Sequence, residues 1–426
     1  MANLQELLRN RHLPGHAKGC YSVCTANPLA IRAAMRQARE DSSVLLLEAT
    51  SNQVNQFGGY TGMRPADFRE FVYELAKKES LPVEQVTLGG DHLGPNPWQR
   101  EPAHIAMQRA EELIAEYARE GFVKIHLDTS MACAGDPSPL PPATVAERSA
   151  QLCAVAERSA EGAKPIYVIG TEVPTPGGAV EELSSLSVTT VSAAEETLAV
   201  HRQAFHARGL TDAFDRVIAM VVQPGVEFDH DSIHDYQPAA AGKLAYWLTS
   251  QDSLVFEAHS TDYQRPESYR QMIRDGFAIL KVGPAITFAM REALFALAEI
   301  ETCLLAQERC SHLRETVEQA MLVSPKDWKS HYHGTENEQR LLRIFSYSDR
   351  IRYYWFVPKV KAAVERLMEN LRADAIPETL LSAYLPLEYA ALRNGTLKLD
   401  PLEIVLHATQ RSFRPYAIAC RSYPAQ

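Results

Sequence analysis

The chain has 426 residues, of which 46% are hydrophobic and 23% are charged. This is the composition of a globular protein with a large core, and the length suits two or three ordinary domains or one barrel with an extension. The formal net charge is −10 and no cluster of Lys and Arg occurs, which argues against nucleic acid as the main partner. An anionic substrate would therefore need a local basic pocket.

The sequence also bears on the cellular compartment. The seven cysteines are odd in number and form no CxxC pair, as is typical of buried thiols in a reducing compartment. The N-terminal segment has no apolar region like that of a secretory signal, and no run of about 18 apolar residues occurs. We therefore expect a cytoplasmic protein without membrane segments.

Eight short apolar runs alternate with longer amphipathic segments. Their near-continuous hydrophobicity is typical of parallel strands that are covered on both faces. The predicted strands are Cys20–Cys24, Val44–Ala49, Val86–Asp91, Val123–Asp128, Pro165–Thr171, Val217–Gln223, Ser253–His259 and Ala278–Gly283. Between them, helical periodicity predicts helices over 27–41, 65–80, 101–121, 141–159, 193–209 and 266–276.

This alternation fits either a (β/α)8 barrel or a doubly wound sheet. Polar residues at the C-terminal ends of six strands favour the barrel, because barrel enzymes place their active sites there. An open sheet would gather such residues at one switch point instead. The six are Glu48, Asp91, Asp128, Glu172, Gln223 and His259. We predict a TIM barrel over residues 1–300 and a helical extension packed on it over 301–426.

Two histidines stand at predicted strand ends. In GGDHLGPNPW (89–98), His92 can ligate a divalent metal through a neutral imidazole nitrogen, and Asp91 beside it can act as an acid/base. The alternative is a structural turn in which Asp91 caps the next helix. His259 adds a second imidazole at the same rim, unless residues 260–262 form an ordinary loop that caps a helix.

Two other strand ends offer weaker ligands. Glu172 is either a ligand or base, or a surface acid on a rigid Pro/Gly-rich loop. Gln223 either coordinates through its amide oxygen or satisfies buried backbone groups. Because these residues would meet at one barrel mouth, they suit a metal-assisted reaction on a sugar. The predicted metal ligands are His92, Glu172, Gln223 and His259, and the predicted catalytic residues are Asp91, Glu172 and Asp128.

Substrate contacts are expected from the loops at the same mouth. The amides of residues 52–56 suit a polyhydroxylated ligand, or they belong to a solvated loop. A phosphate is expected after the last two strands, where small residues and backbone N–H groups follow. The segment DRIRYYW (349–355) either reaches a phosphate or anchors packing. The predicted substrate-binding residues are Glu48, Asn52, Gln53, Gln56, Ser260, Asp262, Lys281, Gly283 and Arg350.

Several of these segments resemble the signature segments of the GatZ/KbaZ family. They are EATSNQVNQFGGYTGM, GGDHLGPNPWQ, KIHLDTSM, YVIGTEVPTPGG, VVQPGVEFDH, FEAHSTDYQ and SDRIRYYW. The resemblance extends from about Leu7 to beyond residue 400 and implies a (β/α)8 barrel. It also implies a role in sugar-phosphate metabolism. Members are described as D-tagatose 6-phosphate 4-epimerases or as non-catalytic subunits of class II D-tagatose-1,6-bisphosphate aldolase, and the name tagatose 6-phosphate kinase is also used.

A more distant similarity to class II aldolases implies the same metal site. Asp91 and His92, Glu172 and His259 match the aldolase pattern, while Gln223 stands in place of the middle histidine. That departure puts metal affinity and aldolase turnover in question, because an amide oxygen binds zinc less well than imidazole. The similarity implies a divalent metal, with Zn²⁺ preferred over Mn²⁺ or Mg²⁺.

Three functions follow from the resemblance. The polar residues favour a metal-dependent D-tagatose 6-phosphate 4-epimerase, because inversion at C4 needs cleavage and re-formation of the C3–C4 bond with a metal and a base. The second is a stabilising partner of a class II aldolase catalytic subunit, in which these residues would be vestigial. The third is a kinase, but no GxxxxGK[ST] loop occurs. Association into a homo-oligomer is left open.

Overall fold

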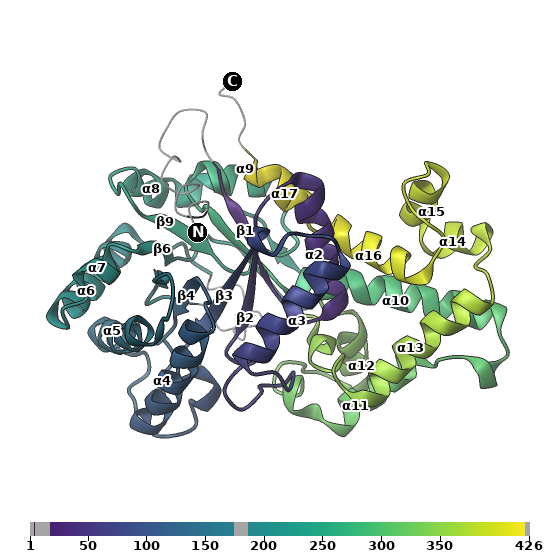
Figure 1. Cartoon of the computed structure of the whole chain (residues 1–426), viewed down its shortest axis with the longest axis horizontal. Coiled ribbons are helices and arrows are strands. Elements are labelled where there is room, and N and C mark those ends of the chain that lie inside the picture. The colour runs from purple at the N-terminus through teal and green to yellow at the C-terminus, as the bar shows by residue number, and fades with distance from the viewer. Residues whose placement is uncertain (1–3, 5–17, 174–185, 422–426) are drawn as a thin grey trace.

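The computed structural model describes residues 4, 18–173 and 186–421. Eight parallel strands close into a barrel, in the order β1-β10-β9-β6-β5-β4-β3-β2 (Figure 1). The strands are β1 (Cys20–Cys24), β2 (Leu45–Thr50), β3 (Val86–Leu93), β4 (Lys124–Leu127), β5 (Ile166–Ile169), β6 (Val217–Val221), β9 (Val255–Ala258) and β10 (Ile279–Val282). The predicted TIM barrel is therefore confirmed, and each strand lies within two residues of its predicted bounds.

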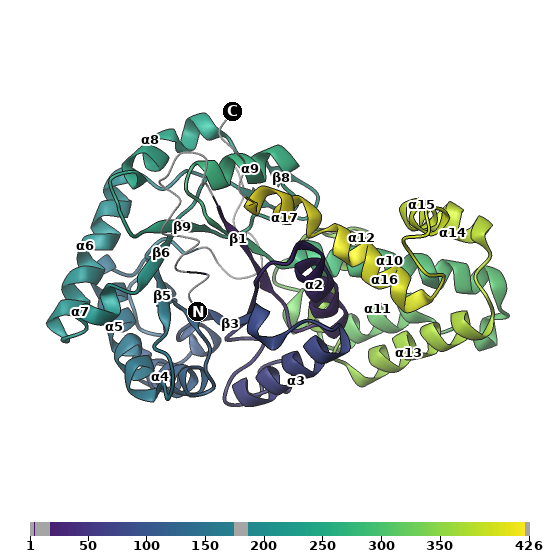
Figure 2. The ribbon, with the colours of Figure 1, turned by 45° about the horizontal axis from the view of Figure 1, so that its top comes forward.

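Helices surround the barrel (Figure 2). They are α2 (Pro28–Asp41), α3 (Pro65–Lys78), α4 (Ala103–Arg119), α5 (Pro142–Ser159), α6 (Val191–Ala207), the short α7 (Thr211–Phe214), α8 (Pro238–Leu248), α9 (Pro266–Arg274) and α10 (Pro284–Leu304). Most of them begin with proline, whose missing N–H has no partner to lose in the first turn. The six helices expected from periodicity are all present.

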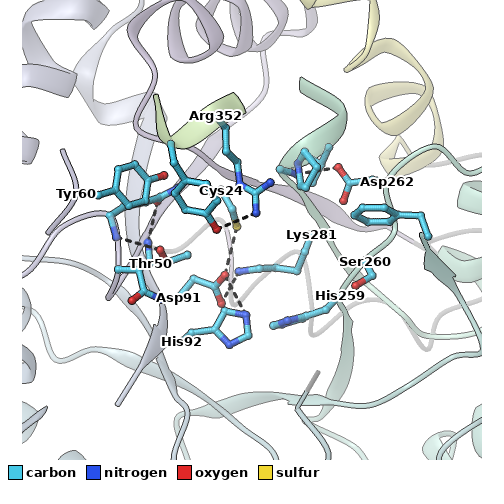
Figure 3. A pocket seen from close by; sticks show the side chains of 17 residues that line it. Cys24, Thr50, Tyr60, Asp91, His92, His259, Ser260, Asp262, Lys281 and Arg352 are labelled. Carbon is cyan, nitrogen blue, oxygen red and sulfur yellow. Dashed lines mark hydrogen bonds and ion pairs between the residues drawn. The ribbon is translucent and has the colours of Figure 1, made fainter. Parts of the chain in front are cut away.

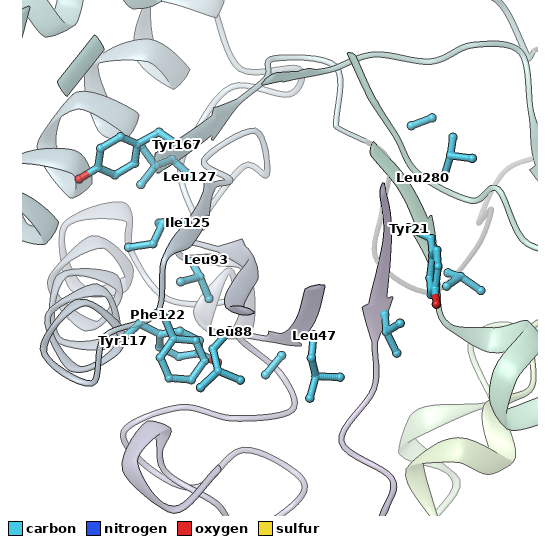
Figure 4. Close-up of a cluster of buried hydrophobic side chains, with 14 of the residues drawn as sticks. Tyr21, Leu47, Leu88, Leu93, Tyr117, Phe122, Ile125, Leu127, Tyr167 and Leu280 are labelled. Atoms are coloured by element: carbon cyan, nitrogen blue, oxygen red, sulfur yellow. The ribbon is translucent and has the colours of Figure 1, made fainter. Parts of the chain in front are cut away.

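The main core lies between the strands and this ring of helices. Outward-facing strand residues such as Leu47, Ile125 and Leu280 are fully buried there, together with Tyr117 and Phe122 (Figure 4). The barrel interior has a second apolar cluster, formed by Leu46, Ile166, Val168, Val173, Ile218, Ala219, Val221, Val255, Ala278 and Ile279 with Leu4. None of the described helices combines the length and apolar content that crossing a bilayer requires.

The C-terminal region is helical, as predicted, and has a core of its own. It consists of α11 (Leu313–Val323), α12 (Glu336–Phe345), α13 (Pro358–Ala373), α14 (Glu378–Tyr384), α15 (Pro386–Arg393), α16 (Pro401–Arg411) and α17 (Arg414–Cys420). The long helix α10 belongs to both parts, since it follows the last barrel strand and also contributes to the second core. The predicted boundary at residue 300 falls inside this helix. The last helix, α17, packs back against α9 and β1 (Figures 1 and 2).

A buried ion pair joins the extension to α10. The Arg291 guanidinium is 2.9 Å from a carboxylate oxygen of Asp349, and both side chains are almost fully buried. The Thr287 hydroxyl donates a 2.6 Å hydrogen bond to the other oxygen of this carboxylate, and Arg291 also stacks over the Phe288 ring. Asp349 has a φ of 43°, a left-handed conformation that Asp and Asn tolerate better than most residues. This contact sets the position of the short 3-10 turn η7 (Arg350–Tyr353) that follows.

Asp349→Asn tests this anchor. The variant keeps the shape and the left-handed backbone but leaves Arg291 as an uncompensated buried charge, so we expect the free energy of unfolding to fall by about 3 kcal/mol. Thermal unfolding followed by circular dichroism should show a lower midpoint. The matched control is Asp374→Asn, which removes an exposed pair with Arg309 and should have almost no effect, because surface ion pairs contribute about 0–1 kcal/mol. Equal midpoints for the two variants would contradict the role of the Asp349 carboxylate.

Candidate metal centre and cavity

A layer of charged side chains lies inside the barrel. It is closer to the C-terminal ends of the strands than the apolar residues Leu46, Val255 and Ile279, which precede the charged residues by two positions. Lys124 on β4 pairs with Glu48 on β2 at 2.5 Å and with Glu257 on β9 at 2.7 Å, and all three side chains are fully buried. Lys281 on β10 also contacts Glu48, and it lies 3.7 Å from Glu257. Alternate residues of a strand face the same side of the sheet. These four residues contact one another from different strands, so each of them occupies a position that faces the barrel interior. The four therefore form a network in which each ammonium group bridges two carboxylates.

Glycine at position 89 makes room for this layer. Glu48 pairs in register with Gly89 on the neighbouring strand. A Cβ atom at Gly89 would lie 2.7 Å from Glu48 Oε1 and 2.9 Å from Glu48 Cγ, closer than real Cβ contacts. Any other residue would therefore push the Glu48 carboxylate away from the lysines.

Asp91 connects the charged layer to the barrel mouth. Its carboxylate is 2.9 Å from the Lys281 ammonium and 3.0 Å from His126 Nδ1. The Cys24 thiol donates to the other carboxylate oxygen at 3.5 Å, and burial raises the pKa of this thiol well above its usual value. Burial alone would raise the pKa of Asp91. The neighbouring His92 and Lys281 lower it, with help from the two other imidazoles, and the net pKa lies well below the usual range. Asp91 is therefore an ionised carboxylate at neutral pH.

Three imidazoles converge above this layer. The ring centroids of His92 and His259 are 4.9 Å apart, those of His92 and His126 are 5.2 Å apart, and those of His126 and His259 are 5.4 Å apart. All three residues are buried. They come from β3, β4 and the end of β9, so only the closed barrel brings them together.

Each imidazole is oriented by a carboxylate. His92 Nδ1 is 2.7 Å from Asp128, His126 Nδ1 is 3.0 Å from Asp91, and His259 Nε2 is 3.0 Å from Glu257 Oε1. Carboxylates in such outer positions fix the ring orientation of metal-binding histidines. The Nε2 atom of His126 is buried and has no hydrogen-bond partner. An orphaned imidazole nitrogen of this kind is either an energetic cost or a ligand atom.

Protonation differs among these groups. Burial lowers the pKa of His259 to about 4, so this ring is neutral at pH 7. Burial alone would also lower the pKa of His92, but Asp91 and Asp128 raise it more, and the net pKa is above the usual value. For Asp128, burial alone would raise the pKa, but the hydrogen bond to His92 and the charges of His92 and His126 together outweigh burial and lower the pKa to about 2. Asp128 is thus an ionised partner of His92 whose other oxygen accepts hydrogen bonds from Ser130.

An irregularity in β3 brings Asp91 and His92 into the same site. Successive residues of a regular strand point to opposite faces. In β3, Gly90 pairs with Ile125 but Leu93 pairs with Leu127, so β3 contains one extra residue at this point. His92 takes a left-handed conformation with φ 47°. Such bulges re-aim side chains next to active sites, and here both side chains of the Asp-His pair contribute to the cluster.

The charge balance of the cluster fits a divalent cation. Four carboxylates and two ammonium groups are buried together, namely Glu48, Asp91, Asp128 and Glu257 with Lys124 and Lys281. The two ammonium groups compensate two of the four negative charges, and a protonated His92 would compensate one more, because its pKa is raised. The cluster keeps an excess of negative charge in either case, which is costly in a buried site. Asp91, His126, Glu257 and His259 each offer a ligand atom, and these atoms all lie within 4.8 Å of one another. The residues present therefore fit a divalent metal held by His126 and His259 with carboxylate oxygens beside them, and the His92 ring adjoins both imidazoles.

A cavity opens above the imidazoles (Figure 3). One wall comes from the loop after β2, another from the residues after β9 and β10, and a third from the helical extension. Its polar lining residues are Cys24, Thr50, Asn52, Gln53, Tyr60, Asp91, His92, His259, Ser260, Asp262, Lys281, Arg352 and Tyr353. Ser260 has a left-handed φ of 52°, so a second strained residue stands at the rim.

The structure gathers most of the predicted site residues around this cavity. Asp91, His92, His259 and Lys281 line it, together with Asn52, Gln53, Ser260, Asp262 and Gly283. Glu48 lies below it in the charged layer, and Asp128 supports His92. The Gln56 amide lies outside the lining and donates to the Arg109 carbonyl.

Three predicted residues are not brought to the cluster. Glu172 is exposed, two residues before the undescribed segment 174–185. The Gln223 amide oxygen accepts hydrogen bonds from the backbone N–H groups of Gly225 and Val226, so it stabilises its own loop. Arg350 is buried, and its Nε donates to the Asp327 carbonyl outside the cavity lining.

Sequence reasoning did not name Lys124, His126 and Glu257, nor Arg352 itself, as residues of the site. Period-two alternation could have found the first three. Lys124, His126 and Asp128 are two residues apart along one strand, and Glu257 and His259 are two apart along another, so each set shares a face. Arg352 lies in the segment DRIRYYW, for which contact with a phosphate is one of two expectations, but the residue predicted from that segment is Arg350.

Known structures include a close match to this chain. A crystal structure described as a probable tagatose 6 phosphate kinase from Sinorhizobium meliloti 1021 is 50% identical, with a TM-score of 0.88 over 95% of this chain and 100% of that chain. Two remote likenesses have TM-scores of 0.43 and 0.40. They are a fructose-bisphosphate aldolase from Campylobacter jejuni, 13% identical over 88% of this chain and 94% of that one, and the YdjI aldolase from Escherichia coli K12, 11% identical over 88% and 98%.

The family comparison covers nearly the whole chain. Residues 4–421 match the model of the D-tagatose-1,6-bisphosphate aldolase subunit GatZ/KbaZ-like family. The match includes the barrel, the imidazole cluster and the helical extension that completes the cavity. The chain therefore belongs to the GatZ/KbaZ-like family.

Proposed function

We propose that the chain is a metal-dependent D-tagatose 6-phosphate 4-epimerase, which interconverts this sugar with D-fructose 6-phosphate. The observation that carries the proposal is the convergence of His92, His126 and His259 beside an ionised Asp91, with an orphaned nitrogen on His126. A non-catalytic barrel would have no need to keep such a strained and charged arrangement buried. Membership of a family named after tagatose chemistry supports the choice of sugar.

The proposed metal ligands are His126 and His259, which belong to the group of converging ligand atoms, together with His92, whose ring adjoins both. A nitrogen-rich set suits Zn²⁺, whereas Mg²⁺ prefers oxygen ligands and an octahedral shell. Glu172 and Gln223 are left out of this set, because Glu172 is exposed and the Gln223 amide oxygen accepts hydrogen bonds from its own loop. A bound divalent cation supplies Lewis acidity at the C2 and C3 oxygens of a ketose.

The reaction needs a base at the 4-hydroxyl. C4 is not adjacent to the C2 carbonyl, so deprotonation at carbon cannot invert it. Asp91 takes the proton of the 4-hydroxyl, the C3–C4 bond breaks, and its electron pair moves toward C2 to leave an enediolate and a three-carbon aldehyde phosphate. The aldehyde turns its other face, the bond re-forms, and Asp91 returns the proton to O4. No atom or electron is gained or lost overall.

Lys281 and the charged layer position this base. The Lys281 ammonium is 2.9 Å from Asp91 and is itself held by Glu48. The burial of Lys281 lowers its pKa, but Asp91, Cys24 and the glutamates raise it more, so that the net pKa lies well above the usual value. Lys281 therefore stays charged and orients Asp91 without acting as a nucleophile.

An accessory role in an aldolase is the second candidate, favoured by the family description as an aldolase subunit. In that case the cavity would bind no substrate for turnover, and triose products would appear only when a catalytic subunit is added. The name of the 50% identical structure suggests a third activity, phosphoryl transfer from ATP.

Metal content tests the proposed ligands. The purified wild-type chain, dialysed and analysed by mass spectrometry of metals, should retain close to one equivalent of Zn²⁺, and His126→Gln should retain almost none. His104→Gln is the matched control, because His104 is exposed at the start of α4, and it should match the wild type. Equal metal content in both variants would remove His126 from the site.

Turnover distinguishes the three functions. We expect the full chain to convert D-tagatose 6-phosphate into D-fructose 6-phosphate without ATP, to lose activity after dialysis against EDTA, and to regain it with Zn²⁺. His126→Gln should lower kcat/KM at least about 100-fold, since even supporting groups of a metal site are worth 10–100-fold. Formation of trioses only with an added partner would favour the accessory role instead, and ATP consumption would favour a kinase.

A further inference from the structure

The usual phosphate site of a barrel is already occupied by one of this chain's own carboxylates. Barrel enzymes commonly bind phosphate with the loops after the last two strands and a helix N-terminus. Here Asp262 accepts hydrogen bonds from the backbone N–H groups of Gly283 at 3.0 Å and Ala285 at 2.8 Å, at the start of α10. Asp262 is buried, so a phosphate at this position would meet engaged donors and a carboxylate. The anion must then be bound elsewhere in the cavity.

Arg352 is a cation in the cavity lining without a carboxylate partner. Among the described residues, no carboxylate oxygen lies within 4 Å of its guanidinium, whereas Lys281 is surrounded by carboxylates. The Arg352 Nη1 group donates to the backbone carbonyls of Ser348 and Asp349, and Nη2 donates to the Tyr353 hydroxyl at 3.0 Å. These partners orient the guanidinium, and none of them is a carboxylate. The charges of Asp349 and Asp262 act on Arg352 only from beyond ion-pair distance.

Aromatic rings hold Arg352 in place at the junction of barrel and extension. Its guanidinium carbon lies 4.6 Å from the centroid of the Tyr353 ring. Tyr353 in turn meets Tyr60, from the loop after β2, edge to face with centroids 5.0 Å apart. The nearby Asp349 carboxylate forms its direct contacts with Arg291 and Thr287 and makes none with the Arg352 guanidinium. A rigid, half-buried guanidinium that none of the described carboxylates binds directly is what bidentate phosphate recognition uses.

We propose that Arg352, supplied by the helical extension, binds the phosphate of the sugar phosphate. This inference rests on the proposed function for its substrate, but phosphate binding can be measured without turnover. Figure 3 places Arg352 on the opposite side of the cavity from His92 and His259, with Lys281 between them. A ketose 6-phosphate whose C2 to C4 atoms face the imidazoles therefore extends its phosphate toward Arg352.

The position of the phosphate has a consequence for the reaction. After the C3–C4 bond breaks, the phosphate stays on the C4–C6 aldehyde fragment. Arg352 then keeps that fragment in the cavity while its aldehyde group turns, so that re-addition competes with escape. Loss of Arg352 should therefore raise the release of free aldehyde phosphate relative to epimerisation.

Calorimetric titration of the full chain with inorganic phosphate tests the site, with chloride at equal ionic strength as reference. Arg352→Gln should weaken phosphate binding at least about tenfold, the usual value of a hydrogen bond to a charged group. Arg352→Lys should fall between this variant and the wild type, because the charge remains but the planar fork is lost. Lys359→Gln is the control, because Lys359 is exposed at the start of α13 and outside the cavity lining, and it should bind like the wild type.

Equal phosphate affinity in wild type and Arg352→Gln, or no phosphate binding by the wild type, would overturn the assignment. Kinetics give an independent readout: Arg352→Gln should lower kcat/KM for D-tagatose 6-phosphate at least about tenfold and leave that for unphosphorylated D-tagatose unchanged. An equal loss with both sugars would point to a structural role and overturn the proposal. If phosphate binds through Arg352 but no epimerisation occurs, the anion site stands and the proposed function fails.

Discussion

The buried charged layer is the constraint on which the rest of this site depends. Lys124 and Lys281 neutralise Glu48 and Glu257 inside the barrel, where isolated charges would be prohibitively costly. The same layer orients Asp91 through Lys281 and His259 through Glu257. Because negative charge is in excess, the layer also creates the electrostatic demand that a divalent cation among the imidazoles would satisfy.

The extension is part of the site because it completes the cavity wall. Helix α10 links the two cores, and the buried pair of Arg291 with Asp349 sets the turn that carries Arg352 and Tyr353. A barrel that ended at residue 300 would keep the imidazoles but lose this wall. The barrel and the extension thus both contribute residues to the cavity. The buried pair of Arg291 with Asp349 is one of the contacts that join them, and the pair of Arg36 on α2 with Glu403 on α16 is another.

The sequence predicted the barrel and much of the cavity lining, because both follow from local pattern. Parallel strands covered on both faces are short apolar runs, and polar residues at their C-terminal ends must meet at one mouth. Asp91, His92 and His259 were found in this way. The pattern could not place Glu172 or Gln223, because a residue one or two positions beyond a strand points wherever its loop directs it. Gln223 turns back to its own loop, and Glu172 faces solvent.

By itself, the sequence determined the order of strands and helices, since hydrophobic periodicity and proline positions specify them within a few residues. Tertiary structure alone decided which side chains meet. A bulge in β3 turns His92 to the same side as Asp91, and closure of the barrel adds His126 as a third imidazole. Arg352 enters the cavity from more than 200 residues beyond His126. Such contacts depend on distances across the fold, which no local pattern of residues records.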